Sequence, residues 1–371
     1  MIEAVPDTGF LSPGQAAAKR AARHATGSGR LGRTLLVHGP AGAGKDAFVG
    51  DLLALLFCAD PDPERRPCNA CRGCRDARSR VHQDLVVGSP EAWREMRSTG
   101  ESIVAAARRW LLEAAGAPVV ADRRVVLIDR ADRANEQTQN ALLKTLEEPT
   151  DRHVFILVAD EPARLLPTIR SRSQPLRVGP VARAELVAYL MDHRRLPADQ
   201  ADALARIANG LAGTALAYAD NAELLAWRRR VQAELLSLLS RGRADRFASV
   251  RDLLDETTRL GVAPPTSAEA EADAPRTPAS VQREAAMLLV EAWLDLTRDL
   301  LVACAGRAEL APSRELAPAV ADLGGRVGAH ALIRMVALLE RMHDGLRENA
   351  APKLALEAAM LAWPMLPPPA R

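Results

Sequence analysis

One loop in the sequence has residue types and spacing that suit the binding of a nucleotide phosphate. In the stretch HGPAGAGKDAF, residues 38–48, Gly39, Gly44 and Lys45 match the two glycines and the lysine of a phosphate-binding loop. A strand-like run, TLLVH, precedes the loop and a helical pattern follows it. Backbone N–H groups can therefore converge on an anion at the N-terminus of a helix.

A dinucleotide-binding loop is the alternative interpretation of the same stretch. Gly42, Gly44 and Ala47 fit the pattern G-x-G-x-x-A. That interpretation leaves Gly39 and Lys45 unexplained, so the phosphate-binding loop of a nucleotide-hydrolysing fold is the better description.

The loop lacks the hydroxyl group that such sites use to bind Mg²⁺. The position after Lys45 should be Ser or Thr, and here it is Asp46. At about 4 Å and an effective dielectric of about 20, a carboxylate and a phosphate repel by about 4 kcal/mol. Asp could instead bind Mg²⁺ itself, and the run VVLID supplies Asp129 as a second carboxylate for the metal. The loop alone leaves binding of ATP and Mg²⁺ open.

Four of the five cysteines form a second cluster with metal-binding spacing. The pattern Cys58-x9-Cys68-x2-Cys71-x2-Cys74 brings four thiolates within reach of one Zn²⁺ at about 2.3 Å each. Four sulfur ligands leave no open coordination position, so the predicted zinc site is structural. Free thiols or a redox pair are the alternatives, whereas Cys304 fits a small buried apolar residue. Six nearby arginines are expected to form a solvated surface: Arg65, Arg66, Arg72, Arg75, Arg78 and Arg80.

The elements that must position these residues follow an α/β pattern. Four apolar runs separated by helical stretches indicate a parallel sheet covered on both faces: 34–38, 84–87, 125–129 and 154–158. The segment 135–148 is predicted to be an amphipathic helix with Asn135 as its N-cap and Pro149 just beyond its end.

After residue 178 the sequence becomes helical. Helices are expected over 183–196 and 198–209, ending near the glycines of 210–213, and again from residue 222 onward. The stretch 262–280 is rich in Pro, Ala, Ser and acidic residues and is predicted to be a loose insertion.

Bulk properties exclude some classes of protein. The 49 basic and 47 acidic side chains nearly balance, and aromatic residues make up only 3%, so a stand-alone nucleic-acid binder using the arginine-rich cysteine module is disfavoured. Without a signal-like start or an apolar run long enough to cross a bilayer, the chain is expected to be cytoplasmic, with no membrane partner.

Two longer runs carry a resemblance to a known family. NALLKTLEEP at 140–149 and LLPTIRSRSQ at 165–174, behind a defective phosphate loop with a four-cysteine insertion, resemble the AAA+ clamp-loader family of bacterial DNA polymerase III. The delta prime type of subunit is the most similar. The resemblance covers about residues 29–178 and continues more weakly to ENAAPKLALEAAML at 348–361.

The resemblance implies three domains and a set of partners. The expected domains are an AAA+ α/β domain with a parallel sheet over 1–178, which contains the zinc module 58–74, a small helical lid over 179–221 and an all-α collar over 222–371. The expected assembly is a hetero-pentamer with the gamma/tau motor subunits and the delta subunit. Through that complex the chain would act on the sliding clamp and on primed DNA during replication.

The resemblance also implies roles for single residues. Ser171-Arg172-Ser173 corresponds to the S-R-C motif of the family, so Arg172 is expected to be an arginine finger that completes the ATP site of a neighbouring subunit. From the residue type alone, a simple ion pair is the alternative.

Other positions that hydrolysis requires in this family depart from the pattern. The Glu expected after Asp129 is Arg130, which cannot accept a proton at physiological pH. Ala159 or Asp160 replaces the polar first sensor, and the second-sensor segment GLAGTA, 210–215, has no arginine. The expected protein is therefore a non-catalytic subunit of the polymerase holoenzyme, and an active AAA+ ATPase motor subunit is the alternative.

Overall fold

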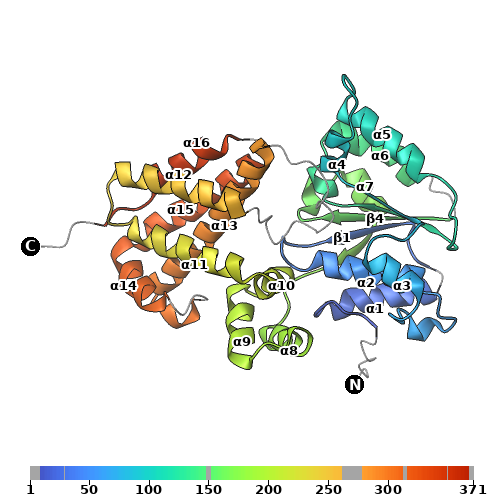
Figure 1. Ribbon diagram of the computed structural model, residues 1–371, viewed down its shortest axis with the longest axis horizontal. Coiled ribbons are helices and arrows are strands. Elements are labelled where there is room, and N and C mark those ends of the chain that lie inside the picture. The colour runs from blue at the N-terminus through green and yellow to red at the C-terminus, as the bar shows by residue number, and fades with distance from the viewer. Residues whose placement is uncertain are drawn as a thin grey trace, which may run out of the picture. The chain divides into compact units, whose positions relative to one another are not determined.

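The computed structural model describes residues 9–28, 30–147, 152–260, 278–311, 316–348 and 350–366. The chain forms two compact units (Figure 1). The first comprises Met1–Leu196 and Gly210–Thr214, and the second comprises Pro197–Asn209 and Ala215–Arg371. The expected three-domain division stays a prediction. Residues 262–277 of the expected insertion 262–280 lie outside the described residues, and residues 278–280 are helical, so the prediction of a loose segment is wrong for these three.

The first unit is an α/β layer, as the sequence predicts. Its strands are β1 (Thr34–His38), β2 (Leu85–Gly88), β3 (Arg124–Ile128), β4 (His153–Ala159) and β5 (Gln174–Arg177). Its helices are α1 (Ala16–Gly27), α2 (Lys45–Phe57), α3 (Arg72–Arg78), α4 (Pro90–Glu95), α5 (Ile103–Ala114), α6 (Glu136–Glu147), α7 (Pro167–Arg172) and α8 (Arg183–Arg194).

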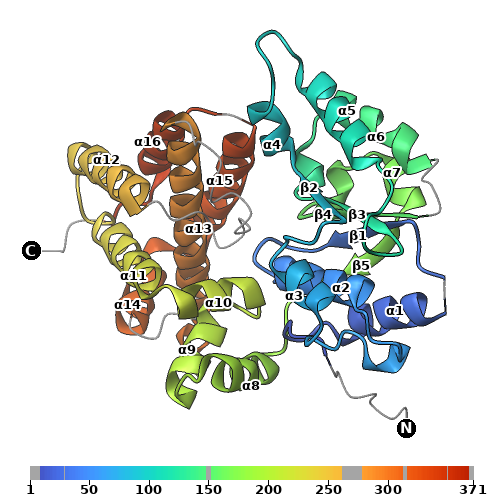
Figure 2. The ribbon, with the colours of Figure 1, turned by 45° about the vertical axis from the view of Figure 1, so that its right-hand side comes forward.

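The strands form one parallel sheet in the order β2-β3-β4-β1-β5. Neighbouring side chains of each strand point to opposite faces, so Leu35 and Val37 join one core while Leu36 joins the other. Helices α1, α2 and α3 cover the first face, and α4 to α7 cover the second (Figure 2). The predicted doubly covered parallel sheet is confirmed.

The ends of the strands and helices follow local chemistry. The amide of Thr138 donates to Asn135 Oδ1 at 2.8 Å, which makes Asn135 the predicted N-terminal cap of α6. The sequence pattern does not indicate strand β5, because its sequence QPLR contains Pro175 and is apolar at only one buried position, Leu176. Pro175 is compatible with this strand because β5 lies at the edge of the sheet, where a missing N–H leaves no ladder bond unmade.

The described residues of the second unit form helices and the turns that connect them. Its helices are α9 (Ala198–Ile207), α11 (Ala222–Ser237), α12 (Arg243–Leu260), α13 (Pro278–Cys304), α14 (Ala317–Val327), α15 (Ala329–Arg347) and α16 (Pro352–Ala362), while α10 (Ala212–Asp220) belongs to both units. The long helix α13 packs against α11, α12, α14, α15 and α16. Among the described residues, no helix has both the length and the apolar character needed to span a membrane.

Candidate nucleotide site and four-cysteine cluster

The predicted phosphate loop has the expected backbone between β1 and α2. Gly42 and Gly44 have φ values of 75° and 91°, a region that side chains other than glycine disfavour. Gly39 allows a close approach, since a Cβ there would lie 1.8 Å from the carbonyl oxygen of Val178. These glycines therefore serve the shape of a phosphate loop.

Lys45 is the residue that would bind phosphate, but its ammonium group already contacts other groups of this chain. Its Nζ atom donates to the carbonyl oxygens of Gly39 and Pro40 at 2.8 and 2.9 Å. It also forms a 2.6 Å ion pair with Asp160 Oδ1, and its side chain is only 9% exposed. An ammonium group has three donors, and these three acceptors match them. Phosphate binding by Lys45 would require breaking these contacts.

The partner of Lys45 lies at the position where the sequence predicts a departure from the first sensor. Asp160 follows β4, and the turn after that strand is held by Asp132. The Oδ2 atom of Asp132 accepts hydrogen bonds from the backbone amides of Asp160 and Glu161 at 3.1 and 2.8 Å. Burial raises the pKa of Asp132, whereas the amide of Glu161 lowers it. Asp160 is thereby held on the side of the site where Lys45 points.

A guanidinium group lies between the two carboxylates assigned to Mg²⁺. Arg80 Nη1 pairs with Asp129 Oδ2 at 2.9 Å, and Arg80 Nη2 pairs with Asp46 Oδ1. The Arg80 side chain is only 17% exposed, so the prediction of a solvated surface is wrong for this arginine. It is also wrong for Arg78, which pairs with the fully buried Asp51 at 2.8 Å. Of the six, Arg65, Arg72 and Arg75 are exposed as predicted.

Burial and charge act in opposite directions at this bridge. Burial raises the pKa of Asp129, and the positive charge of Arg80 works against that increase. For Arg80, burial disfavours the charged form, but the two carboxylates outweigh it and raise its pKa. The positive charge of Arg80 therefore favours the ionised form of the buried Asp129 carboxylate.

The rest of the candidate nucleotide site offers little that could support hydrolysis. Arg130 follows Asp129, as the sequence shows, with a left-handed φ of 49°. The turn Gly210–Thr214 packs directly on the phosphate loop: the amide of Thr214 donates to the carbonyl of Gly42 at 3.1 Å. A Cβ at Gly213 would lie 3.1 Å from the amide nitrogen of Gly44, so this turn covers part of the loop.

Arg172 lies apart from the phosphate loop, at the C-terminal end of α7. Its side chain is exposed, and Nη1 is 3.4 Å from the carbonyl oxygen of Thr168 on the previous turn. The next residue, Ser173, is buried and donates through Oγ to the carbonyl of Ile169 at 2.7 Å. Within the motif, Ser173 is therefore buried, while Ser171 and Arg172 are exposed at the surface.

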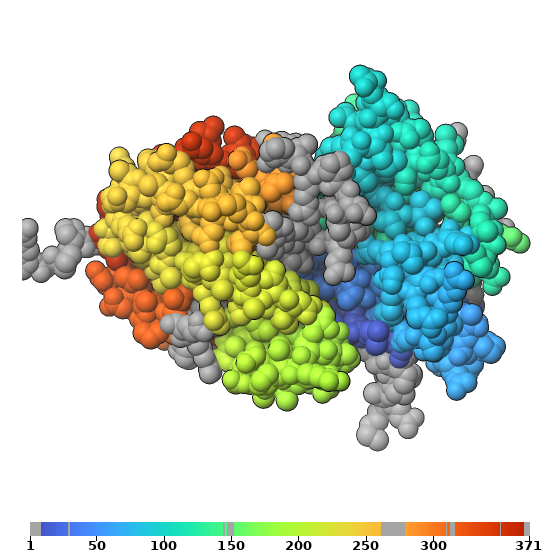
Figure 3. Space-filling view, viewed as in Figure 1, coloured from blue at the N-terminus to red at the C-terminus, as the bar shows by residue number. Residues whose placement is uncertain are grey.

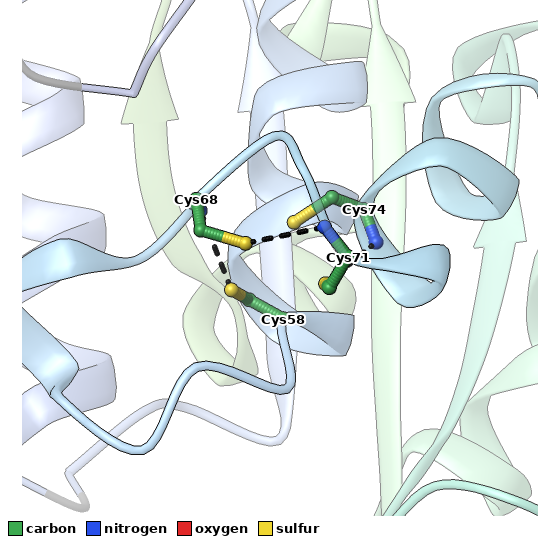
Figure 4. Close-up of side chains that lie close together, drawn as sticks. All are labelled: Cys58, Cys68, Cys71 and Cys74. Carbon is green, nitrogen blue, oxygen red and sulfur yellow. Dashed lines mark hydrogen bonds between the residues drawn. The ribbon is translucent and has the colours of Figure 1, made fainter.

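The four cysteines predicted to bind metal come together in the structure (Figure 4). Their Sγ atoms all lie within 4.8 Å of one another. Tetrahedral zinc with bonds of about 2.3 Å requires sulfurs about 3.8 Å apart, so small adjustments would complete the site. Cys58 ends α2 and Cys71 caps α3, so the cluster joins these two helices. The segment that carries it lies at the surface of the first unit (Figure 3, blue).

The backbone around the sulfurs supplies donors that suit thiolate ligands. Amides donate to Cys58 Sγ from Cys68 at 3.3 Å, to Cys68 Sγ from Cys71 at 3.4 Å and to Cys71 Sγ from Cys74 at 3.4 Å. The pKa of Cys68 is lowered to about 6, mainly by the hydrogen bond that its sulfur accepts from the amide of Cys71. Burial raises the pKa of Cys58 and Cys74. A bound metal ion would oppose this increase, because it stabilises the thiolate form of its ligands. The cluster fits a structural metal such as zinc.

Comparison with known proteins points to one family. Residues 14–182 match the family described as DNA polymerase III, delta subunit. The delta prime subunit of Pseudomonas aeruginosa is 34% identical over 179 residues, which cover 46% of this chain and 49% of that protein. The Escherichia coli delta prime subunit is 32% identical over 190 residues, covering 51% and 55%. A gamma/tau subunit of Mycobacterium bovis is 33% identical over 155 residues, covering 41% and 26%.

The matching region spans about half the length of these delta prime relatives. It includes the phosphate loop, the four cysteines and Arg172. The matches support a clamp-loader delta prime-like protein, in line with the resemblance that residues 140–149 and 165–174 indicate.

Proposed function

We propose that the chain is a non-hydrolysing subunit of a bacterial DNA polymerase III clamp loader. In this role it would help to load the sliding clamp onto primed DNA and would supply Arg172 to the ATP site of a neighbouring motor subunit. The similarity to delta prime subunits supports the assignment to a clamp loader. The contacts within the candidate nucleotide site support the absence of ATP hydrolysis.

The contacts of Lys45 are the observation that carries the proposal. In a working site this ammonium group must meet the transferring phosphates. Here it is buried against two loop carbonyls and paired with Asp160. A bound nucleotide would have to compete with a contact ion pair that is already desolvated and preorganised.

The alternative, an active motor subunit, also has support from a relative, because a gamma/tau subunit is 33% identical to the chain over 155 residues. It requires Lys45, Asp46 and Asp129 to rearrange toward phosphate and Mg²⁺. Arg130 would still leave the neighbouring position without a base that could activate water. The contacts of the pocket therefore favour the non-hydrolysing subunit.

The exposed position of Arg172 supports a role outside this chain's own pocket. A guanidinium group is permanently charged and can stabilise the charge that develops on a transferring phosphoryl group. Arg172 is the last residue of α7 and precedes the buried Ser173, whose hydroxyl group bonds to the carbonyl of Ile169. These contacts fix the backbone position of Arg172 at the surface.

Assembly with partner subunits tests the proposed function. When the purified chain is mixed with the gamma/tau and delta subunits of its own organism, we expect one complex of five subunits by size-exclusion chromatography with light scattering. The Arg172→Ala variant should assemble equally well, because this residue would act in hydrolysis rather than in folding. Elution of the chain alone, with the other subunits assembled without it, would refute the proposed role.

A further inference from the structure

Arg80 takes the position that a divalent cation would need. Asp46 lies in the first turn of α2 and Asp129 directly follows β3, and these are the two carboxylates that the sequence assigns to Mg²⁺. The guanidinium of Arg80 contacts both of them. A cation therefore already lies between these carboxylates, and it belongs to the chain itself.

The backbone of Arg80 is in a conformation that its side chain disfavours. Its φ is 56°, in the left-handed region where residues other than glycine are uncommon. Such a conformation persists only where the surrounding structure determines it, and it often marks a functional position. Three backbone bonds of 2.9 to 3.1 Å fix this turn after α3: Ser79 to Arg75, Arg80 to Ala77 and Val81 to Asp76.

Helix α3, which leads into Arg80, is attached to α2 near both of its ends. At its start, Cys71 and Cys74 meet Cys58, the residue that ends α2. At its other end, Arg78 pairs with Asp51 of α2 at 2.8 Å. The two helices lie side by side (Figure 2). The cysteine cluster therefore attaches Arg80 to the same helix that carries Asp46.

We propose that Arg80 is a built-in cation that takes the place of the divalent metal between Asp46 and Asp129, and that the metal-bound four-cysteine module holds it there. The module thereby helps to keep the nucleotide pocket inert. The inference deepens the proposed function because it concerns the same pocket. Its test needs neither ATP hydrolysis nor a partner subunit, so the two can fail independently.

Replacing Arg80 should create a divalent-cation site. In Arg80→Gly the guanidinium is lost, and glycine suits the left-handed backbone. We expect this variant to bind Mn²⁺ at least about tenfold more tightly than the unmodified chain, because a fixed positive charge in contact with a divalent ion opposes its binding. Binding of Mn²⁺ alone is measured from the decrease in the electron paramagnetic resonance signal of the free ion.

Two control variants separate this site from general charge effects. Arg75→Ala removes an exposed positive charge from the same helix and should leave Mn²⁺ binding unchanged. Adding Asp129→Asn to Arg80→Gly should abolish the gain. Equal Mn²⁺ binding by the unmodified chain and Arg80→Gly would overturn the assignment of Arg80.

The role of the module is tested by loosening its connection to Arg80. Zinc is removed with a chelator, the chelator is removed, and Mn²⁺ is titrated into protein shown to be folded by circular dichroism. A second variant keeps the metal but carries one extra glycine after Ser79. Both should gain Mn²⁺ binding that Asp129→Asn abolishes. A gain in Arg80→Gly but in neither of these proteins would overturn the module's role.

Discussion

Replacing Arg172 with Ala should stop ATP hydrolysis at the neighbouring site of the assembled clamp loader. A guanidinium supplied in trans accelerates phosphoryl transfer by about 10³-fold or more, because it stabilises charge that develops on the γ-phosphoryl group. Rapid-quench measurement of the complex with clamp and primed DNA should therefore lose the hydrolysis phase that belongs to this site, and the steady-state rate should fall.

Arg170 provides a matched control for that experiment. It is an exposed arginine on the same helix, α7, two residues before Arg172. Arg170→Ala removes the same charge from the same helix and should leave the stimulated rate nearly unchanged, because its side chain points in a different direction from that of Arg172. Equal rates for Arg172→Ala and the unmodified complex would remove the arginine finger from the account.

Removing the metal should strongly destabilise the first unit. The site joins the end of α2 to α3, and structural zinc sites contribute apparent binding energies of about 10 kcal/mol or more to folding. Even a loss of several kcal/mol from a unit of this size should lower Tm by about 10 °C or more. Calorimetry with and without a chelator measures this change, and metal analysis should give one zinc ion per chain.

The fifth cysteine supplies the control for the metal prediction. Cys71→Ser removes one ligand and should reproduce the effect of the chelator. Cys304→Ser, at the end of α13, lies far along the chain from the cluster and should keep both the zinc and the Tm. A chain that is purified without metal and melts at the same temperature with chelator would contradict the structural zinc site.

The sequence predicts the α/β layer well because its signals are local. Strands β1, β3 and β4 are apolar on both faces, and such runs have few other stable arrangements than the centre of a covered sheet. Asn135 caps α6 through a bond to an amide three residues away, which the order of residues alone can indicate. Strand β5 lacks such a signal, because an edge strand with one buried residue tolerates Pro175 and polar side chains.

The contacts on which the proposed lack of hydrolysis rests can be predicted only in part from the sequence. Asp46 and Arg130 stand at positions that motifs define, so their effect on hydrolysis can be predicted. Arg80 belongs to no motif, and its contact with Asp129, 49 residues later, depends on how α3 and β3 meet in space. The sequence indicates a departure from the first sensor at Ala159 or Asp160, but the pairing of Asp160 with Lys45 depends on the turn that Asp132 holds.

These contacts suggest how a phosphate loop can keep its shape without its reactivity. The glycines retain the backbone, while Lys45 is paired with Asp160 and the two carboxylates share Arg80 as their partner. Internal partners are present at an effectively fixed high concentration, so a nucleotide in solution competes with them at a disadvantage. In the proposed function, the pocket is therefore a structural part of the subunit.

ATP hydrolysis by the purified chain alone tests this account most directly. With Mg²⁺ and millimolar ATP, we expect a rate no greater than that of Lys45→Ala, because the lysine is already withdrawn from phosphate chemistry. Turnover of about 1 s⁻¹ or more, within the ordinary range of enzymes, that disappears in Lys45→Ala would contradict it.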